Sequence, residues 1–213
     1  HVAALEKHLA PVAAQFIPLV AVQRRTTRPN AVHKAQMLDD GDNWVRSEAT
    51  PSREDSDLLP TAPEPRRGPA TELLGRTNQA LLIGEGGSGK SRCLAALAFE
   101  AAREWKPGQP WPLLVSLSAY SAQGLAGLLA TESGIDWQDL APRVRAGELT
   151  LYLDGLNECP DLFYDQCLKE IAGILREYPA ARVLVTSRSA QLPPEFKLEV
   201  FELEAMDRAC QSK

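Results

Sequence analysis

The chain has 213 residues, which is enough for one α/β domain with a sizeable core and an extension. Its formal net charge of -5 does not indicate a basic face for nucleic acid, so direct nucleic-acid binding is not expected. No apolar run reaches the length of about 18 residues that indicates a membrane-spanning helix, and residues 1–10 lack the pattern of a signal peptide.

The cysteines and histidines show no metal-binding or disulfide pattern. The four cysteines form no C-x-x-C pair, and Cys93 and Cys167 fall within predicted helices. This usage favours reduced thiols and a cytoplasmic location. The histidines lack metal-ligand spacing and are interpreted as surface residues: His1, His8 and His33.

Residues 1–22 form a predicted lead-in of one helix and one strand. The helix covers residues 1–15, where apolar side chains recur near the helical period. It is either a packing helix at the domain edge or part of a connector to an upstream domain. A short strand is expected within residues 16–22, and Pro18 predicts that this strand lies at a sheet edge.

Residues 23–70 differ in composition from the rest of the chain. Pro, Ser, Arg, Asp and Glu dominate, as in SEATPSREDSD and PTAPEPRRGP. Such a segment buries little apolar surface, so we expect an insert that is loop or partly disordered. The ordered domain is expected over residues 71–206, and residues 207–213 are expected to start a further helix.

The domain is predicted to alternate strands with helices. Five strands are expected over residues 80–83, 111–117, 149–153, 182–186 and 197–203. Helices are expected over residues 71–74, 92–105, 122–131, 137–146 and 163–178. This alternation predicts an α/β fold with a largely parallel sheet and helices on both faces. Ligands of such sheets bind at the carboxyl ends of the strands.

The stretch GEGGSGKS, residues 84–91, matches the P-loop pattern G-x-x-x-x-G-K-[ST] between a predicted strand and a predicted helix. Glycines allow backbone N–H groups to surround phosphate oxygens, and the helix start adds its positive dipole end. Lys90 provides a cation for the β- and γ-phosphates, and the Ser91 hydroxyl is a ligand for Mg²⁺. The predicted nucleotide-binding residues are Gly84, Glu85, Gly86, Gly87, Ser88, Gly89, Lys90, Ser91 and Arg92.

Two further segments follow predicted strands. Asp154 ends an apolar strand, which is the position of a Walker B carboxylate. We expect it to bind Mg²⁺ beside Ser91. Glu158 is a candidate base for the attacking water. The alternative is that Asp154-Gly155 is a turn and Glu158 a solvated acid. Arg188 follows the fourth strand as part of Thr186-Ser187-Arg188. It is either a sensor of the γ-phosphate or a surface arginine.

Together, GEGGSGKS, LTLYLDGLNE and VLVTSR resemble the NACHT family of STAND-class P-loop ATPases, which are related to AAA+ ATPases. The resemblance implies a three-layer sandwich with sheet order 5-1-4-3-2 and a sensor 1 role for Arg188. It also implies ATP and ADP as ligands, with Mg²⁺. A further implication is switching between a closed ADP-bound monomer and a self-associated form in a signalling or innate-immune protein with flanking domains.

The chain departs from the family pattern D-G-x-D-E at Asn157, which replaces the second acid. Glu158 then serves as the base alone, or hydrolysis is slow. The leading hypothesis is a slow ATPase switch in which Glu158, Lys90 and Arg188 are catalytic and Ser91 and Asp154 bind Mg²⁺. The alternative is a nucleotide-gated binding scaffold with little or no hydrolysis. A phosphotransferase is a third hypothesis, although no acceptor site is evident in the sequence.

Overall fold

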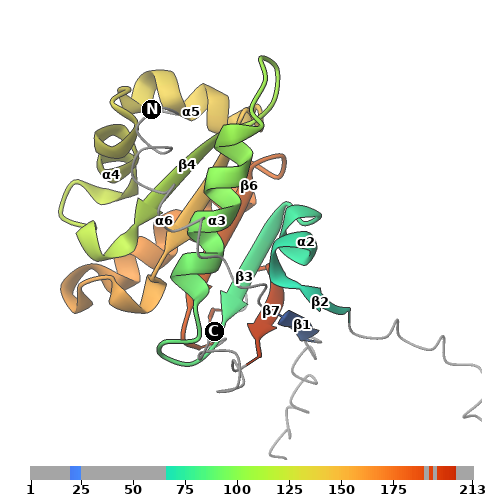
Figure 1. The fold of residues 1–213 in the computed structure, drawn as a ribbon. Coiled ribbons are helices and arrows are strands. Elements are labelled where there is room, and N and C mark those ends of the chain that lie inside the picture. The colour runs from blue at the N-terminus through green and yellow to red at the C-terminus, as the bar shows by residue number, and fades with distance from the viewer. Residues whose placement is uncertain (1–19, 25–65, 190–191, 194–195, 205–213) are drawn as a thin grey trace, which may run out of the picture. The chain divides into compact units, whose positions relative to one another are not determined.

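A sheet of seven strands in the order β2-β1-β7-β3-β6-β5-β4 is the centre of the fold (Figure 1). The computed structural model describes residues 20–24, 66–189, 192–193 and 196–204. The helices predicted over residues 1–15 and 207–213, and most of the predicted insert, lie outside these ranges.

The five predicted strands are present and parallel to one another. They are β3 (Gln79–Ile83), β4 (Trp111–Ser116), β5 (Leu149–Asp154), β6 (Arg182–Ser187) and β7 (Glu199–Leu203). Their pairing gives β7-β3-β6-β5-β4, which is the order 5-1-4-3-2 expected for these five. Their side chains are mostly buried, as a sheet covered on both faces requires. The carboxyl ends of β3, β5 and β6 therefore lie side by side.

The prediction of a five-stranded sheet is wrong, because two antiparallel strands extend it beyond β7. These are β1 (Val20–Arg24), which pairs with β7, and β2 (Arg67–Pro69), which pairs with β1. Because β1 has a neighbour on both sides, it is not the edge strand that Pro18 predicted. β2 falls in the segment predicted as loop. Three residues containing glycine and proline carry no strand pattern, and their conformation depends on pairing with β1.

Helices cover both faces of the sheet. They are α2 (Ala70–Gly75), α3 (Lys90–Arg103), α4 (Gly124–Ser133), α5 (Trp137–Arg145) and α6 (Tyr164–Glu177). Strand β3 shows the division: Leu81 and Ile83 join a buried cluster with residues of α4, α5 and α6, whereas Ala80 and Leu82 join a cluster with residues of α2 and α3. The alternation of side chains along a strand produces these two cores.

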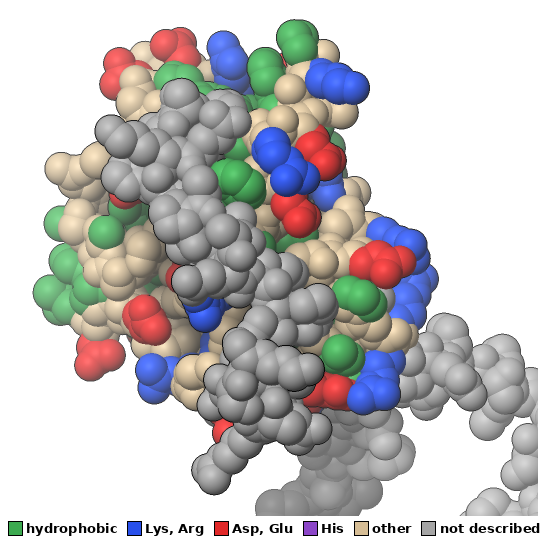
Figure 2. Space-filling view, in the orientation of Figure 1, with side chains coloured by type: hydrophobic (Ala, Val, Ile, Leu, Met, Phe, Trp, Pro, Cys, Tyr) green, Lys and Arg blue, Asp and Glu red, His purple; other side chains and the backbone are tan. Residues whose placement is uncertain are grey.

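The surface of the described residues carries both signs of charge. Figure 2 shows acidic and basic side chains interspersed on the visible face. Two exposed ion pairs, Arg24–Glu202 and Arg67–Glu204, connect β1 and β2 to β7 and the residue that follows it. Within the described residues, no helix combines the length and the apolar character that crossing a membrane requires.

Candidate nucleotide-binding site

The loop between β3 and α3 contains two positions whose backbone conformation only glycine adopts without strain. Gly87 and Gly89 have φ angles of 78° and 92°. At Gly84, a Cβ atom would lie 2.8 Å from Ser88 Oγ, so a side chain there would displace the loop. Gly86 differs, because a Cβ there would contact nothing within 4 Å. This glycine lines the cavity described below.

Helix α3 begins at Lys90, and no side chain caps its N-terminus. The residue before it, Gly89, has a left-handed backbone, and its carbonyl accepts the first helical hydrogen bond from Cys93 N–H at 2.8 Å. An uncapped helix start presents backbone N–H groups and a partial positive charge, which favour an anion.

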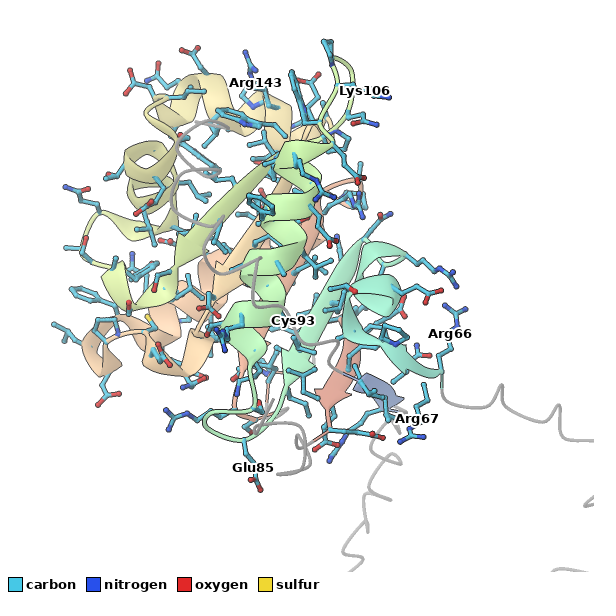
Figure 3. The ribbon with its side chains drawn as sticks, viewed as in Figure 1. Arg66, Arg67, Glu85, Cys93, Lys106 and Arg143 are labelled. Carbon is cyan, nitrogen blue, oxygen red and sulfur yellow. The ribbon has the colours of Figure 1, made fainter. Side chains whose placement is uncertain are left out.

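The Lys90 side chain folds back over the loop. Its Nζ donates to the carbonyl oxygens of Gly84 and Glu85, both at 2.7 Å, and lies 3.4 Å from Ser88 Oγ. The Glu85 side chain is exposed and extends outward from the loop (Figure 3). Glu85 thus contributes a backbone carbonyl, while its carboxylate lies away from the ammonium.

Charged groups from three segments surround this ammonium. Burial lowers the pKa of Lys90 below its usual value, and the nearby Arg188 acts in the same direction. Asp154 and Glu158 oppose this shift. Arg188, Asp154 and Glu158, which were assigned to phosphate, metal and water, are therefore close enough to Lys90 to influence its pKa.

A buried threonine connects the ends of β5 and β6. Thr186 Oγ1 donates to Asp154 Oδ1 at 2.6 Å and accepts a hydrogen bond from Gly155 N–H at 2.7 Å. Gly155 has a φ of 75°, and a Cβ there would lie 3.0 Å from Glu158 Oε2. Thr186 therefore orients the Asp154 carboxylate, and glycine at position 155 allows Glu158 to approach the strand end.

Just beyond these strands, the short helix η2 (Leu156–Glu158) contacts the segment after β6. The backbone N–H of Arg188 donates to Asn157 Oδ1 at 3.0 Å. Asn157 is half-buried, whereas Glu158 and Arg188 are exposed.

A cavity of about 250 Å³ brings these segments together. It is lined by Gly86, Gly87, Gly89, Lys90, Ser91, Arg92, Gly155, Asn157, Glu158, Thr186 and Arg188. A second cavity of about 390 Å³ shares Ser91 and Arg92 with the first and includes Asp154. Ser91 and Asp154 therefore line the same cavity.

A larger cavity of about 750 Å³ contains none of these motif residues. It lies among Trp105, Trp111, Arg143 and neighbouring residues, at the amino end of β4. Size alone therefore does not identify the site; most of the residues predicted to bind phosphate and Mg²⁺ line the two smaller cavities.

Comparison with protein families gives an independent assignment. The family model of the NACHT domain matches residues 78–211, which is more than half of the chain. The chain belongs to the NACHT family. A comparison with curated proteins found no significant match.

The NACHT match includes every segment that lines the two smaller cavities. It starts just before β3 and extends beyond β7, whereas β1 and β2 lie outside it. NACHT proteins are P-loop NTPases, so the family supports nucleotide binding and hydrolysis in general. The α/β fold with its mostly parallel sheet is compatible with this class.

Most predicted site residues of this NACHT domain lie at the two smaller cavities. Gly84, Glu85 and Ser88 do not line either cavity, although each contacts Lys90 through a backbone or side-chain oxygen. Neither the hydrogen bonds of Thr186 nor the one from Arg188 N–H to Asn157 was predicted from the sequence. Polar residues at and just beyond the ends of two neighbouring strands were the available signal, but which atoms meet depends on strand register.

Proposed function

We propose that this NACHT domain binds ATP with Mg²⁺ and hydrolyses it slowly, so that the bound nucleotide acts as a switch. The supporting observation is the cavity of about 250 Å³ that the P-loop shares with the segments after β5 and β6. A phosphate chain in this cavity contacts the uncapped start of α3 and the Lys90 ammonium. Both are suited to anions, and the cavity is open at the glycines.

Two residues at the second cavity, Ser91 and Asp154, fit Mg²⁺. This ion prefers hard oxygen ligands and usually combines one or two carboxylates with phosphate oxygens and water. Ser91 and Asp154 line one cavity, and Asp154 uses only Oδ1 in its bond with Thr186. When bound, Mg²⁺ supplies positive charge that offsets the charge of the phosphates. Thr186 orients the carboxylate for this role.

Two exposed side chains at the cavity complete the proposed chemistry. The Glu158 carboxylate accepts a proton from water, or orients that water toward the γ-phosphate. The Arg188 guanidinium binds the γ-phosphate and so distinguishes ATP from ADP. Both line the first cavity together with Lys90. Lys90 is the third catalytic residue, and its ammonium binds the β- and γ-phosphates.

The family resemblance supports the wider role. In this proposal, the nucleotide state controls self-association of a STAND-class signalling or defence protein. Asn157 supports an alternative, a nucleotide-gated scaffold with little or no hydrolysis. Its amide is neutral and cannot act as a base, and its oxygen already accepts a bond from Arg188.

Substitution of Lys90 tests nucleotide binding. Lys90→Ala removes a cation from the phosphates, and we expect ATP affinity to fall by about 100-fold, as for the loss of strong charge-assisted hydrogen bonds. Equilibrium binding of ATP with Mg²⁺ measures this. Lys106→Ala is the matched control, because Lys106 is exposed and lies at the far end of the molecule from Glu85 (Figure 3). ATP affinity that is unchanged by Lys90→Ala rules out the proposal.

A further inference from the structure

Asn157 connects two segments that carry different parts of the proposed site. It lies in η2, one residue beyond the end of β5, and Arg188 is the first residue after β6. The Arg188 N–H donates to Asn157 Oδ1 at 3.0 Å, and both residues line the cavity of about 250 Å³. One side-chain hydrogen bond therefore joins the Walker B segment to the backbone that carries the arginine of the cavity.

The chemistry of the donor fixes the orientation of the amide. A backbone N–H can only donate, so the oxygen of Asn157 must face Arg188 and its nitrogen must point elsewhere. An aspartate accepts the same bond equally well. The position therefore requires an acceptor of this length rather than an acid, and asparagine meets the requirement without adding negative charge beside the phosphates.

The backbone N–H of Arg188 needs such an acceptor because it lies beyond the hydrogen-bonded part of the sheet. The parallel pairing of β3 with β6 ends at Ile83 and Ser187, and the pairing of β5 with β6 ends at Leu153 and Val185. The Arg188 N–H lies beyond both ladders, and Asn157 provides its acceptor.

We infer that Asn157 is a positioning residue that fixes the backbone of Arg188, and so sets the preference of the site for nucleoside triphosphate over diphosphate. The inference rests on the proposed function, since it assigns a means of regulation to the same site. It also gives Asn157 a structural role that does not require the acid found at this position in the family pattern. Only the side-chain oxygen is needed for this role.

Amide hydrogen exchange in the nucleotide-free protein tests the bond itself. We expect the Arg188 amide to exchange about tenfold faster in Asn157→Ala, as the loss of one hydrogen bond of roughly 1.4 kcal/mol predicts. Asn157→Leu keeps the size of the side chain and is expected to give the same result. Asn157→Asp keeps an acceptor and is expected to exchange at the wild-type rate. Unchanged exchange in both Asn157→Ala and Asn157→Leu overturns the inference.

Relative nucleotide affinity tests whether Asn157 sets the preference of the site for triphosphate over diphosphate. The measurement is the ratio of the dissociation constants for ADP and a non-hydrolysable ATP analogue, both with Mg²⁺. We expect Asn157→Ala and Asn157→Leu to lower this ratio by about tenfold, and to cause no further loss in an Arg188→Ala background. Additive losses, or a wild-type ratio in both single variants, overturn the inference alone. A wild-type protein that binds neither nucleotide overturns the proposed function as well.

Discussion

Thr186 determines how the Asp154 carboxylate faces the second cavity. The Thr186 side chain is 1% exposed, and its hydroxyl serves both Asp154 Oδ1 and Gly155 N–H. Removing the hydroxyl leaves two polar groups at the strand ends without their partner. A buried polar group that loses its partner costs about 1–3 kcal/mol, so this one oxygen affects both the stability of the domain and the geometry of the proposed Mg²⁺ ligand Asp154.

Thr186→Val keeps the shape of the side chain and removes the hydroxyl. We expect the free energy of unfolding to fall by about 2 kcal/mol and the Mg²⁺ dependence of ATP binding to weaken. Chemical denaturation and Mg²⁺ titrations measure the two effects. Thr150→Val is the control, because Thr150 is also a buried threonine of the sheet. Equal effects of the two substitutions on Mg²⁺ dependence would contradict the role of Thr186.

At the level of elements, α6 provides the cap that α4 lacks. No side chain of its own caps the start of α4. The Glu170 carboxylate of α6 instead accepts hydrogen bonds from Leu125 N–H at 2.5 Å and from the Tyr120 hydroxyl at 2.7 Å. Gly124 permits this approach, since a Cβ there would lie 2.8 Å from Glu170 Oε1. The helices that follow β4 and β5 are therefore joined through one carboxylate.

Glu170 gives a pH dependence with a defined sign. Burial alone would raise its pKa, but hydrogen bonds from Leu125, Gln166 and Tyr120 outweigh burial and lower it. A lowered pKa in the folded state means that the ionised form stabilises the fold above the unfolded pKa of about 4.3. This stabilisation is lost as the pH falls through the folded pKa.

We expect Glu170→Gln to lower the free energy of unfolding by about 1–2 kcal/mol at pH 7, with a smaller difference from wild type below about pH 4. Urea denaturation at several pH values measures this. Glu177→Gln is the control on the same helix, because the side chain of Glu177 is 57% exposed. A difference between Glu170→Gln and wild type that does not change with pH would contradict a stabilising role for the ionised Glu170 carboxylate.

The sequence predicts the parallel strands and the P-loop because both carry local patterns. Apolar runs mark β3 and β5, and GEGGSGKS lies between a strand and a helix. Interactions that depend on register leave no such pattern. The pairing of β2 with β1 and the bond from Leu125 to Glu170 join residues that are 45 or more positions apart, so local spacing cannot show them.

At the scale of the whole molecule, the added strands lie at one end of the sheet, apart from the site. β1 and β2 extend the sheet beyond β7, outside residues 78–211 of the NACHT match. Without them β7 would be an edge strand with unpaired backbone groups. The proposed site lies instead at the carboxyl ends of β3, β5 and β6, where parallel α/β sheets bind ligands.

Phosphate release from ATP in a single turnover with Mg²⁺ tests the proposed ATPase activity most directly. We expect slow release by the wild-type protein. In Glu158→Gln we expect ATP to bind and phosphate release to fall by about 100-fold or more, as for loss of a catalytic base. Equal release by the two proteins would contradict the role of Glu158. ATP that stays bound to the wild-type protein without phosphate release would contradict hydrolysis and favour the scaffold.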